Sequence, residues 1–427
     1  DQGYVNAQYK LAIKYDDGLR VAQDYQEAVK WYQKAADQGY VNAQYKLAIK
    51  YDDGLGVAQN YQEAVKWYQK AADQGDRDAQ YNLGIMYANG RGVAQNYEKA
   101  IKWYQKAASR GDVSAQNNLG WMYQYGQGIA QNYKEAIKWY QKAANQGDAA
   151  AQNNLGIIYK NGQGVDQNYQ EALKWFQKAA SQGEATAQNN LGIMYANGQG
   201  VVQNYKEAIK WYKKAAGQGF AAAQNNLGWR YQNSLGVLQN YQEAVKWYKK
   251  AADQGHASAQ NNLGFLYENG LGIAQDYQEA VKWYQKSAEQ EDEYGKANLG
   301  RMYYHGTEIV KDIEEAGKLF KDIANYFVKE VKENSLDGQY ILGWMYQYGQ
   351  GIDQNYQEAV KCYKKSGEQG FAAAQYSLGE MYENGYGVDK DYSKALEYYQ
   401  AAAKQGYAKA EAKVIEITKI LDAITLN

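Results

Sequence analysis

The sequence predicts an all-α solenoid in which about eleven helical hairpins of 36 residues stack in a row. Two observations carry this prediction. A leucine recurs every 36 residues, with one longer step of 43, and each unit has apolar positions at helical spacing. These anchor leucines are Leu11, Leu47, Leu83, Leu119, Leu155, Leu191, Leu227, Leu263, Leu299, Leu342 and Leu378. The motif AQNNLG follows the same period and begins at Ala115, Ala151, Ala187, Ala223 and Ala259.

The composition fits a repeat protein and excludes several classes of function. The chain has 427 residues, with 45 Tyr, 11 Trp, no Pro and a mean hydropathy of -0.79. One buried aromatic ring removes about 150–250 Å² from water, so a few rings per unit can form a core. The net charge is -1, from 47 basic and 48 acidic residues, so we do not expect a nucleic-acid partner. No apolar run reaches the roughly 20 residues that span a bilayer, so we expect no membrane span.

The fourth unit shows the pattern of the first helix in each hairpin. Ala115, Leu119, Gly120 and Tyr123 are spaced so that they share one stripe of a helix. A glycine inside a helix costs about 1 kcal/mol relative to alanine. We therefore expect Gly120 to allow the close approach of a neighbouring helix.

Two glycines separated by one residue follow this helix. We expect Gly126 to adopt the left-handed conformation that ends the helix, and Gly128 to shape the turn. A G-x-G motif can cradle a phosphate where it follows a strand and opens a helix. Here the motif links two helices and recurs in most units, so we do not expect a nucleotide site.

The second helix begins at Asn132, three residues before Glu135. This spacing resembles a capping box, in which each side chain bonds a free amide of the first turn. The predicted apolar side carries Tyr133, Ala136, Ile137, Trp139, Tyr140, Ala143 and Ala144, whereas Lys138, Gln141 and Lys142 face outward. A tryptophan recurs on this stripe in eight units, and stacking of the hairpins predicts core packing for it. The eight are Trp31, Trp67, Trp103, Trp139, Trp175, Trp211, Trp247 and Trp283.

The pattern A-x-x-x-L-G-x-x-Y, G-x-G-[VI], N-Y-x-E-A-[VIL]-K-W-Y-x-K-A-A and x-Q-G resembles the Sel-1-like repeat, a branch of the tetratricopeptide superfamily. The resemblance covers nearly the whole chain. It implies a right-handed superhelix of antiparallel helix pairs, with the first helix of each pair on the concave side. It also implies binding without catalysis, because members act as adaptors in protein quality control, cell-wall enzyme regulation and bacterial interaction with host cells. Some secreted members staple each repeat with a cysteine pair, whereas this chain has only Cys362.

We expect a solenoid over residues 1–406, with an irregular long repeat at about 295–337, followed by a C-terminal capping helix over 407–427. The capping helix should turn one apolar stripe inward. That stripe consists of Val414, Ile417, Leu421 and Ile424.

The chain begins inside a repeat. Its first three residues, DQG, match residues 37–39, which end the next unit. We infer that upstream sequence is missing. An export signal would lie in that missing part, so the sequence leaves the compartment open.

The first helices should present a second face, opposite their buried stripe, to the concave groove. Positions two before, two after and five to six after each anchor leucine share this face. The candidate partner-binding residues are therefore Asn117, Trp121, Gln124, Tyr125, Asn153, Ile157, Asn189, Ile193, Asn225, Trp229, Asn261, Phe265, Arg301, Tyr304, His305, Trp344 and Tyr348. Equivalent positions hold Asn161, Asn197, Asn233, Asn269, Tyr340 and Gln347.

This face has two interpretations. A row of Asn amides can pair with the backbone of an extended peptide, while Trp and Phe supply anchoring area. Alternatively, neighbouring Asn side chains bond one another and Trp121 packs under the next helix. Trp121, Trp229 and Trp344 replace Ile or Phe of other units, so the fold does not demand them.

The ninth unit carries seven additional residues around 324–334. Seven residues are about two helical turns, so the second helix can lengthen by about 10 Å without rotating its apolar face. The residues that keep this phase are Phe320, Ile323, Phe327 and Val331. The unit also carries Arg301, Tyr304 and His305 on the groove face. It is either a partner-specific contact or a tolerated edge insertion.

We expect a non-catalytic scaffold or adaptor that holds a partner protein or an extended peptide in the concave groove. The alternative is a carbohydrate or cell-wall binding module, because Trp, Tyr and Asn also suit sugar rings. A hydrolase is not expected, since His256, His305 and Cys362 form no metal spacing and no nucleophile pair. We thus predict no catalytic residue, no metal and no cofactor, and no pattern indicates self-association.

Overall fold

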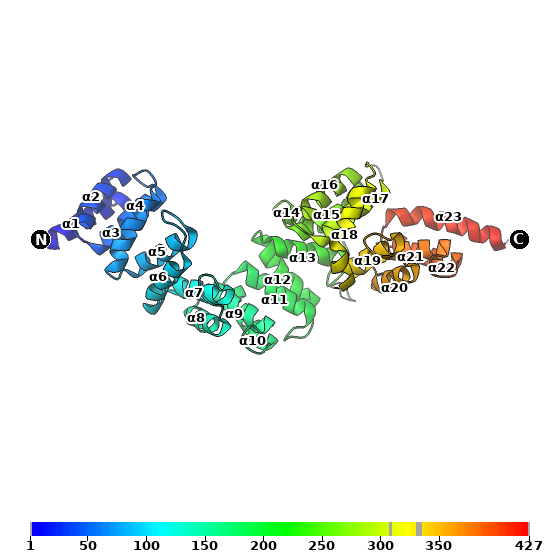
Figure 1. Cartoon of the computed structure of the whole chain (residues 1–427), viewed down its shortest axis with the longest axis horizontal. Helices are drawn as coiled ribbons and strands as arrows, with labels where there is room; N and C mark the ends of the chain where they lie inside the picture. Colours follow the sequence, from blue (N-terminus) through cyan, green and yellow to red (C-terminus); the bar gives the residue numbers. More distant parts are fainter. Residues whose placement is uncertain (1, 307–309, 330–334, 426–427) are drawn as a thin grey trace. The chain divides into compact units, whose positions relative to one another are not determined.

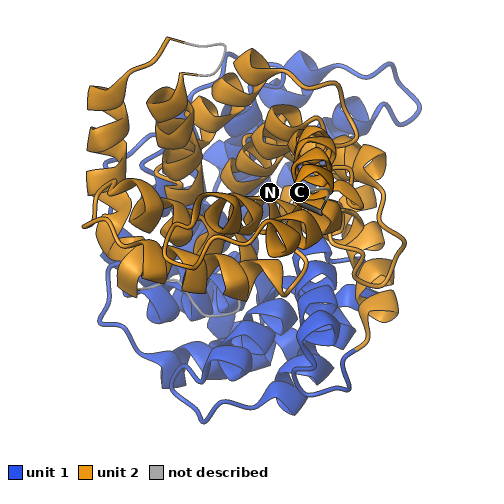
Figure 2. Cartoon of the chain, turned by 90° about the vertical axis from the view of Figure 1, so that its right-hand side faces the viewer, with its two compact units in different colours: residues 1–203 blue, residues 204–427 orange. Residues whose placement is uncertain are grey.

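The computed structural model describes residues 2–306, 310–329 and 335–425. Within these ranges the chain forms 23 α-helices and no strand, which confirms the predicted all-α class. The chain divides into two compact units, residues 1–203 and residues 204–427, which Figure 2 shows in different colours.

Unit 1 contains the helices α1 to α11 (Figure 1). They are α1 (Gln2–Asp17), α2 (Tyr25–Asp37), α3 (Val41–Asp53), α4 (Tyr61–Asp73), α5 (Arg77–Asn89), α6 (Tyr97–Ser109), α7 (Val113–Tyr125), α8 (Tyr133–Asn145), α9 (Ala149–Asn161), α10 (Tyr169–Ser181) and α11 (Ala185–Asn197). Each odd-numbered helix from α1 to α9 packs against the helix that follows it, and each of these hairpins packs against the next. We call the first helix of a repeat its A helix and the second its B helix.

Unit 2 continues the same pattern (Figure 1). Its helices are α12 (Tyr205–Gly217), α13 (Ala221–Gln232), α14 (Tyr241–Ala252), α15 (Ala257–Asn269), α16 (Tyr277–Ala288), α17 (Glu293–His305), α18 (Ile313–Lys329), α19 (Leu336–Tyr348), α20 (Tyr356–Gly367), α21 (Ala372–Asn384), α22 (Tyr392–Ala403) and α23 (Ala408–Thr425). The pairs from α13–α14 to α21–α22 are hairpins, and α23 packs against α22. Stacked hairpins of one repeat length confirm the predicted repeat solenoid.

The helix ends follow the predicted caps, with one difference. Gly126 ends α7 in the left-handed region at φ 70°. At the start of α8, the backbone N–H of Glu135 donates to the side chain of Asn132 over 3.1 Å. The Glu135 carboxylate does not accept a hydrogen bond from the backbone N–H of Asn132. It pairs with Lys138 instead, and the backbone N–H of Asn132 donates to the carbonyl of Tyr123 over 2.8 Å. The predicted reciprocal capping box is therefore wrong here, since the Asn132 amide already has a backbone partner.

Gly120 lies against the ring of Tyr140 on the B helix of its own hairpin. A Cβ atom at Gly120 would lie 2.5 Å from Cδ1 of Tyr140. The ring is fully buried, and its hydroxyl donates to Oε1 of Gln124 over 2.8 Å. The predicted close approach is confirmed. The same pairing joins Gly84 to Tyr104, Gly156 to Phe176, Gly228 to Tyr248, Gly264 to Tyr284, Gly300 to Phe320, Gly343 to Tyr363 and Gly379 to Tyr399.

Gly128 allows its hairpin to pack closely against the preceding one. Its φ is 70°, and a Cβ atom there would lie 2.2 Å from Cβ of Tyr97, the first residue of α6. A side chain would meet both a strained backbone and a steric clash. The G-x-G motif therefore serves the packing of successive hairpins.

The tryptophans of the B helices lie in the core or at its edge. Trp67, Trp103, Trp175 and Trp283 expose at most 9% of their surface, and the other four are half-buried. This confirms the predicted core packing. The lysine three residues later lies over each ring, as Lys142 does 4.1 Å above the centroid of Trp139. The outward lysines thus shield the rings as well as facing solvent.

The B helix of the ninth repeat keeps the predicted phase. It has 17 residues, against 13 in α8. Phe320, Ile323 and Phe327 expose at most 2% of their surface. Val331 lies outside the described residues. The extended part of α18 is therefore anchored in the core through Phe327.

The C-terminal helix α23 faces inward over most of the predicted stripe. Ile417 is fully buried, and Val414 and Leu421 are half-buried against the same cluster. Ile424 is 57% exposed, contrary to the prediction. The cluster that covers Ile417 includes Tyr399 of α22 and ends before it reaches this last turn.

Candidate functional site

The predicted groove positions form what we call the A-helix face: two before, two after, and five to six after each anchor leucine. Asparagines on and beside this face bond one another from repeat to repeat. The bonds join Asn154 to Asn117, Asn190 to Asn153, Asn262 to Asn225 and Asn298 to Asn261, over 3.2, 3.0, 3.0 and 2.8 Å. Asn153, Asn189 and Asn261 are each only 6% exposed. The row ties neighbouring repeats together, as the second interpretation expected. Of the five asparagines two residues before an anchor leucine, Asn117 and Asn225 are half-buried and the other three are buried.

Unit 1 carries an open aromatic pair on this face. Trp121 is 44% exposed and Tyr125 is 55% exposed, with their ring centroids 5.2 Å apart. Trp121 does not pack under the next helix. Ile157 and Ile193, at the same position of the next two repeats, are half-buried. Gln124 differs from the expectation, since it is only 4% exposed and binds Tyr140 inside the hairpin.

Unit 2 has a cavity of about 500 Å³ on the corresponding face. Trp229 and Phe265 line it. Phe371, the residue before α21, lines it as well and stacks on Phe265 with ring centroids 5.6 Å apart. This contact joins α15 to the residue that precedes α21.

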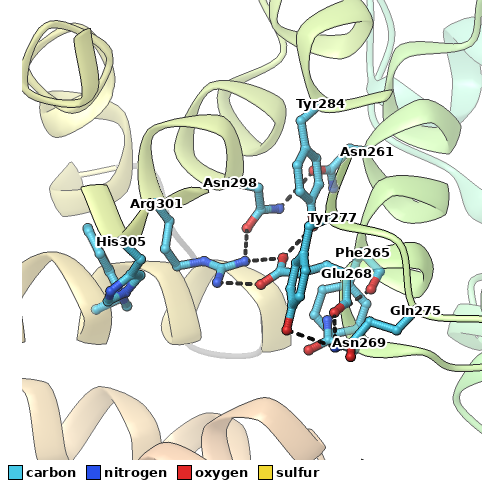
Figure 3. A network of polar contacts seen from close by, with 11 residues as sticks. Asn261, Phe265, Glu268, Asn269, Gln275, Tyr277, Tyr284, Asn298, Arg301 and His305 are labelled. Carbon is cyan, nitrogen blue, oxygen red and sulfur yellow. Dashed lines mark hydrogen bonds and ion pairs between the residues drawn. The ribbon is translucent and has the colours of Figure 1, made fainter. Parts of the chain in front are cut away.

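Arg301 lies inside unit 2 and binds Glu268 (Figure 3). Its Nη1 donates to Oε1 of Glu268 over 2.7 Å, and its Nη2 binds the other carboxylate oxygen. Tyr284 donates to the same carboxylate over 2.9 Å. Burial alone would raise the pKa of Glu268, but the charge and hydrogen bonds of Arg301 outweigh it and lower the pKa to about 2. Arg301 is 7% exposed, so the prediction that it faces a partner is wrong.

The remaining groove residues of repeats nine and ten pack on one another. Trp344 is 3% exposed and stacks on Phe320, with ring centroids 4.8 Å apart. Its indole N–H donates to Nε2 of His305 over 3.3 Å. Tyr304 and Tyr348 lie against both rings. Trp344 therefore belongs to the core, because the Phe320 ring and this cluster cover it.

The pKa of His305 is lowered to about 4. Desolvation among these rings is the main cause, and the positive charges of Arg301 and Lys409 add to it. His305 and Arg301 also line a second, smaller cavity of about 180 Å³, together with Lys409 and Glu380. At neutral pH the histidine is thus an uncharged acceptor for Trp344.

Several residues of these cavities could not be found from the A-helix pattern. Phe371 and Lys409 lie at the starts of helices, outside the A-helix face, and reach the cavities through contacts between distant repeats. The sequence did contain a sign of Glu268 and Arg301, because they carry opposite charges at positions that are uncharged in most repeats. Ser234 also left one, as a serine where the other ten repeats have glycine.

The described residues do not form a cluster of three or more His, Cys, Asp or Glu that could hold a metal ion. Burial raises the pKa of Cys362 to about 11, which keeps the thiol protonated. Among the helices that the structure describes, none combines the length and apolarity needed to cross a bilayer.

Two crystal structures resemble this chain over most of its length. A protective antigen present in uropathogenic Escherichia coli strains, which displays an SLR fold, is 36% identical with a TM-score of 0.65. The match covers 97% of this chain and 87% of that chain. A Sel1 repeat protein from Oxalobacter formigenes is 32% identical with a TM-score of 0.59, over 71% of this chain and 88% of that one. No curated protein matches the chain.

The Sel1 repeat family matches the chain in eleven successive stretches. They are residues 5–40, 41–76, 77–112, 113–148, 149–184, 185–220, 221–256, 257–292, 294–322, 336–371 and 372–407. Each stretch falls on one of the repeats described above, and the ninth stretch ends inside α18. The chain therefore belongs to the Sel1 repeat family.

Proposed function

We propose that this protein is a non-catalytic scaffold that holds a partner protein, through an extended segment, against its A-helix face. The open pair Trp121 and Tyr125 is the observation that carries the proposal. Aromatic residues dominate the binding energy of protein interfaces because they bring large apolar area with few rotatable bonds. An aromatic pair left in water on such a face is best explained by a partner that covers it.

The fold itself does not require this pair. Other repeats of unit 1 place isoleucine at the position of Trp121, as Ile85 and Ile157 show, and their hairpins have the same architecture. Tyr125 likewise stands where neighbouring repeats have Asn89 and Asn161. The fourth repeat thus carries extra aromatic surface that packing within the hairpin leaves uncovered.

The A-helix face is also rigid before it meets a partner. The asparagine bonds between repeats and the buried tyrosines hold successive A helices at fixed positions. A preorganised surface loses little conformational entropy when it binds. This rigidity supports a scaffold that captures a flexible segment.

The two histidines and the single cysteine, which are candidate catalytic groups, are held within the fold. His256 caps α15 by accepting the amide of Ala259 over 3.3 Å, and His305 accepts from Trp344. Cys362 is buried and protonated. These engagements support binding without catalysis.

The test uses one peptide array and one glycan array, probed with the full chain. We expect peptides to bind, and Trp121→Ala/Trp229→Ala to weaken that binding by about tenfold or more, the usual effect of losing interface aromatics. The control is Lys138→Ala/Lys142→Ala on the opposite side of a B helix, which should leave binding unchanged. If no peptide signal depends on the two tryptophans, the proposal fails.

Carbohydrate binding is the competing outcome of the same experiment. Sugar rings stack on flat aromatic faces that are open to water. The guanidinium of Arg230 lies 4.7 Å from the ring centroid of Trp229, and Phe265 stacks on Phe371, so these faces are partly covered. At the unit 2 cavity, this geometry favours a peptide. A tryptophan-dependent signal on the glycan array alone would replace our proposal with the carbohydrate alternative.

A further inference from the structure

The cavity of about 500 Å³ in unit 2 has an uncharged lining. Trp229, Phe265 and Phe371 supply aromatic surface, and Asn, Gln and Ser side chains supply the polar atoms. None of the described residues that line it is Asp, Glu, Lys, Arg or His. The neighbouring smaller cavity contains Arg301 and Lys409 instead, so the absence of charge is particular to the larger one.

Four carboxamide oxygens remain available as acceptors in this lining. The amide nitrogens of Asn233, Gln239, Gln369 and Gln405 each donate to a neighbouring oxygen, over 2.9, 2.9, 2.8 and 2.8 Å. Their oxygens accept no hydrogen bond from the part of the chain that the structure describes. A ligand that brings N–H donors would satisfy them.

A strained residue stands at the edge of the same cavity. Ser234 has φ 56° and lines the cavity, at the position where the other ten repeats use glycine. Gly198 and Gly270, its equivalents in the adjacent repeats, have φ 67° and 66°. A residue with a side chain is disfavoured in this left-handed conformation, and strain of this kind concentrates at binding sites. The Ser234 hydroxyl makes only a 3.3 Å contact with the carbonyl of Val237.

We propose that this cavity receives one large uncharged side chain of the partner's extended segment, and that the backbone N–H groups beside that side chain donate to the open carboxamide oxygens. This inference rests on the proposed scaffold function. A charged side chain would lose its hydration and find no opposite charge in the lining. The volume falls within the about 300–1,000 Å³ typical of ligand pockets. Ser234 contributes a hydroxyl at the rim, which explains why a strained serine stands in place of glycine.

The test begins with a peptide selected by the full chain from a random library displayed on phage. Its affinity is measured by fluorescence anisotropy, and each of its positions is replaced in turn by Asp and by Lys. We expect one position to reject both charges and to accept only large uncharged residues. Gln369→Glu, which adds a charge to the lining without changing its shape, should weaken binding about tenfold or more.

Ser234→Gly separates binding from stability. It relieves the strained backbone, so the melting temperature should stay unchanged or rise, while peptide affinity should fall about two- to tenfold, as expected for one lost hydrogen bond. The matched control is Arg20→Gly. Arg20 also has a positive φ, of 64°, but belongs to unit 1 and does not line this cavity, so its replacement should not change affinity.

The outcomes distinguish this inference from the proposed function. If the peptide depends on Trp121 but tolerates Gln369→Glu and Ser234→Gly, the cavity inference is wrong and the scaffold proposal stands. The inference is also wrong if every peptide position accepts Asp and Lys. If no peptide is selected and chitotriose or maltotriose binds instead, both proposals are wrong.

Discussion

The guanidinium of Arg301 and the carboxylate of Glu268 form a bidentate ion pair in the interior of unit 2, between A helices of adjacent repeats (Figure 3). Arg301 is 7% exposed and Glu268 is 2% exposed. Isoleucine, tryptophan or phenylalanine occupies the position of Arg301 in most other repeats. The pair thus replaces apolar packing by two charges that depend on each other.

Removal of one partner should destabilise unit 2 strongly. Arg301→Ala leaves the Glu268 carboxylate buried without its counter-charge, so we expect a loss of about 3–5 kcal/mol in the free energy of unfolding. The measurement is guanidinium unfolding followed by circular dichroism at neutral pH. The control is Lys138→Ala, which removes an exposed ion pair with Glu135 and should cost less than about 1 kcal/mol. Equal effects of the two changes would contradict the role of burial.

The same pair predicts an acid-sensitive stability. The folded pKa of Glu268, about 2, lies below the value of about 4.3 for an unfolded glutamate. A depressed carboxyl pKa stabilises the fold above the unfolded value, and this contribution disappears as the pH falls from about 4.3 towards 2. Glu268→Gln should therefore reduce the loss of stability over this acidic range. An unchanged acid profile would contradict the assigned pKa shift.

Glu380 predicts the opposite slope nearer neutrality. Burial raises the pKa of Glu380 to about 7. The charges of Lys409 and Lys413 lower this pKa, the charge of Glu383 raises it, and a hydrogen bond from Tyr376 lowers it. A raised carboxyl pKa stabilises the fold below the unfolded value, and that contribution is lost as the pH rises from about 4.3 through 7. We expect Glu380→Gln to flatten this decline, measured as unfolding free energy against pH. Asp337, whose pKa is raised to about 6, should preserve part of the slope.

Gly120 and Gly217 form a matched pair of helical glycines. Gly120→Ala should destabilise the protein by about 1–3 kcal/mol, because its new Cβ would lie 2.5 Å from the Tyr140 ring. The loss should fall at the lower end, since Ala48 occupies the equivalent position in the second repeat. A Cβ atom at Gly217, the last residue of α12, would meet no atom within 4 Å, so Gly217→Ala should stabilise by up to about 1 kcal/mol. Thermal unfolding of both variants measures this difference, and a shift in the same direction would contradict the packing argument.

The asparagine row should contribute to stability. Asn190→Ala leaves the buried Oδ1 of Asn153 without its 3.0 Å partner, so we expect a loss of about 1–3 kcal/mol. The exposed Asn161, also on the A-helix face, provides the control, and its change to alanine should stay within about 0.5 kcal/mol. A double-mutant cycle of Asn153 and Asn190 should show coupling in chemical denaturation. Independent effects would mean that the two side chains do not support each other.

The periodic features were predictable because they repeat. Gly120 and the B-helix tryptophans each recur at one register, so a contact that such a residue makes in one hairpin is made in most of the others. The caps were predicted less completely. The backbone N–H of Asn132 donates to the carbonyl of Tyr123, so Glu135 pairs with Lys138 instead. Helix spacing alone does not reveal that Tyr123 is the partner of Asn132.

The exposure of the A-helix face was not predictable from one unit. Trp121, Trp229 and Trp344 hold equivalent positions, yet the first is open, the second lines a cavity and the third is buried. The difference arises from contacts between distant repeats, such as the stack of Phe265 on Phe371. The prediction that Ile424 faces inward is wrong for a related reason. A helical stripe does not show where the surface that covers it ends.

The most direct test of the scaffold account is photo-crosslinking with the peptide selected by the full chain. A photoreactive phenylalanine analogue replaces Trp121, Tyr125 or Trp229 on the A-helix face, or Trp139 or Trp211 on the B helices. We predict that the peptide crosslinks to the three A-helix positions and not to the two B-helix positions. Crosslinks at the B-helix positions alone would contradict the claim that the A helices form the binding surface.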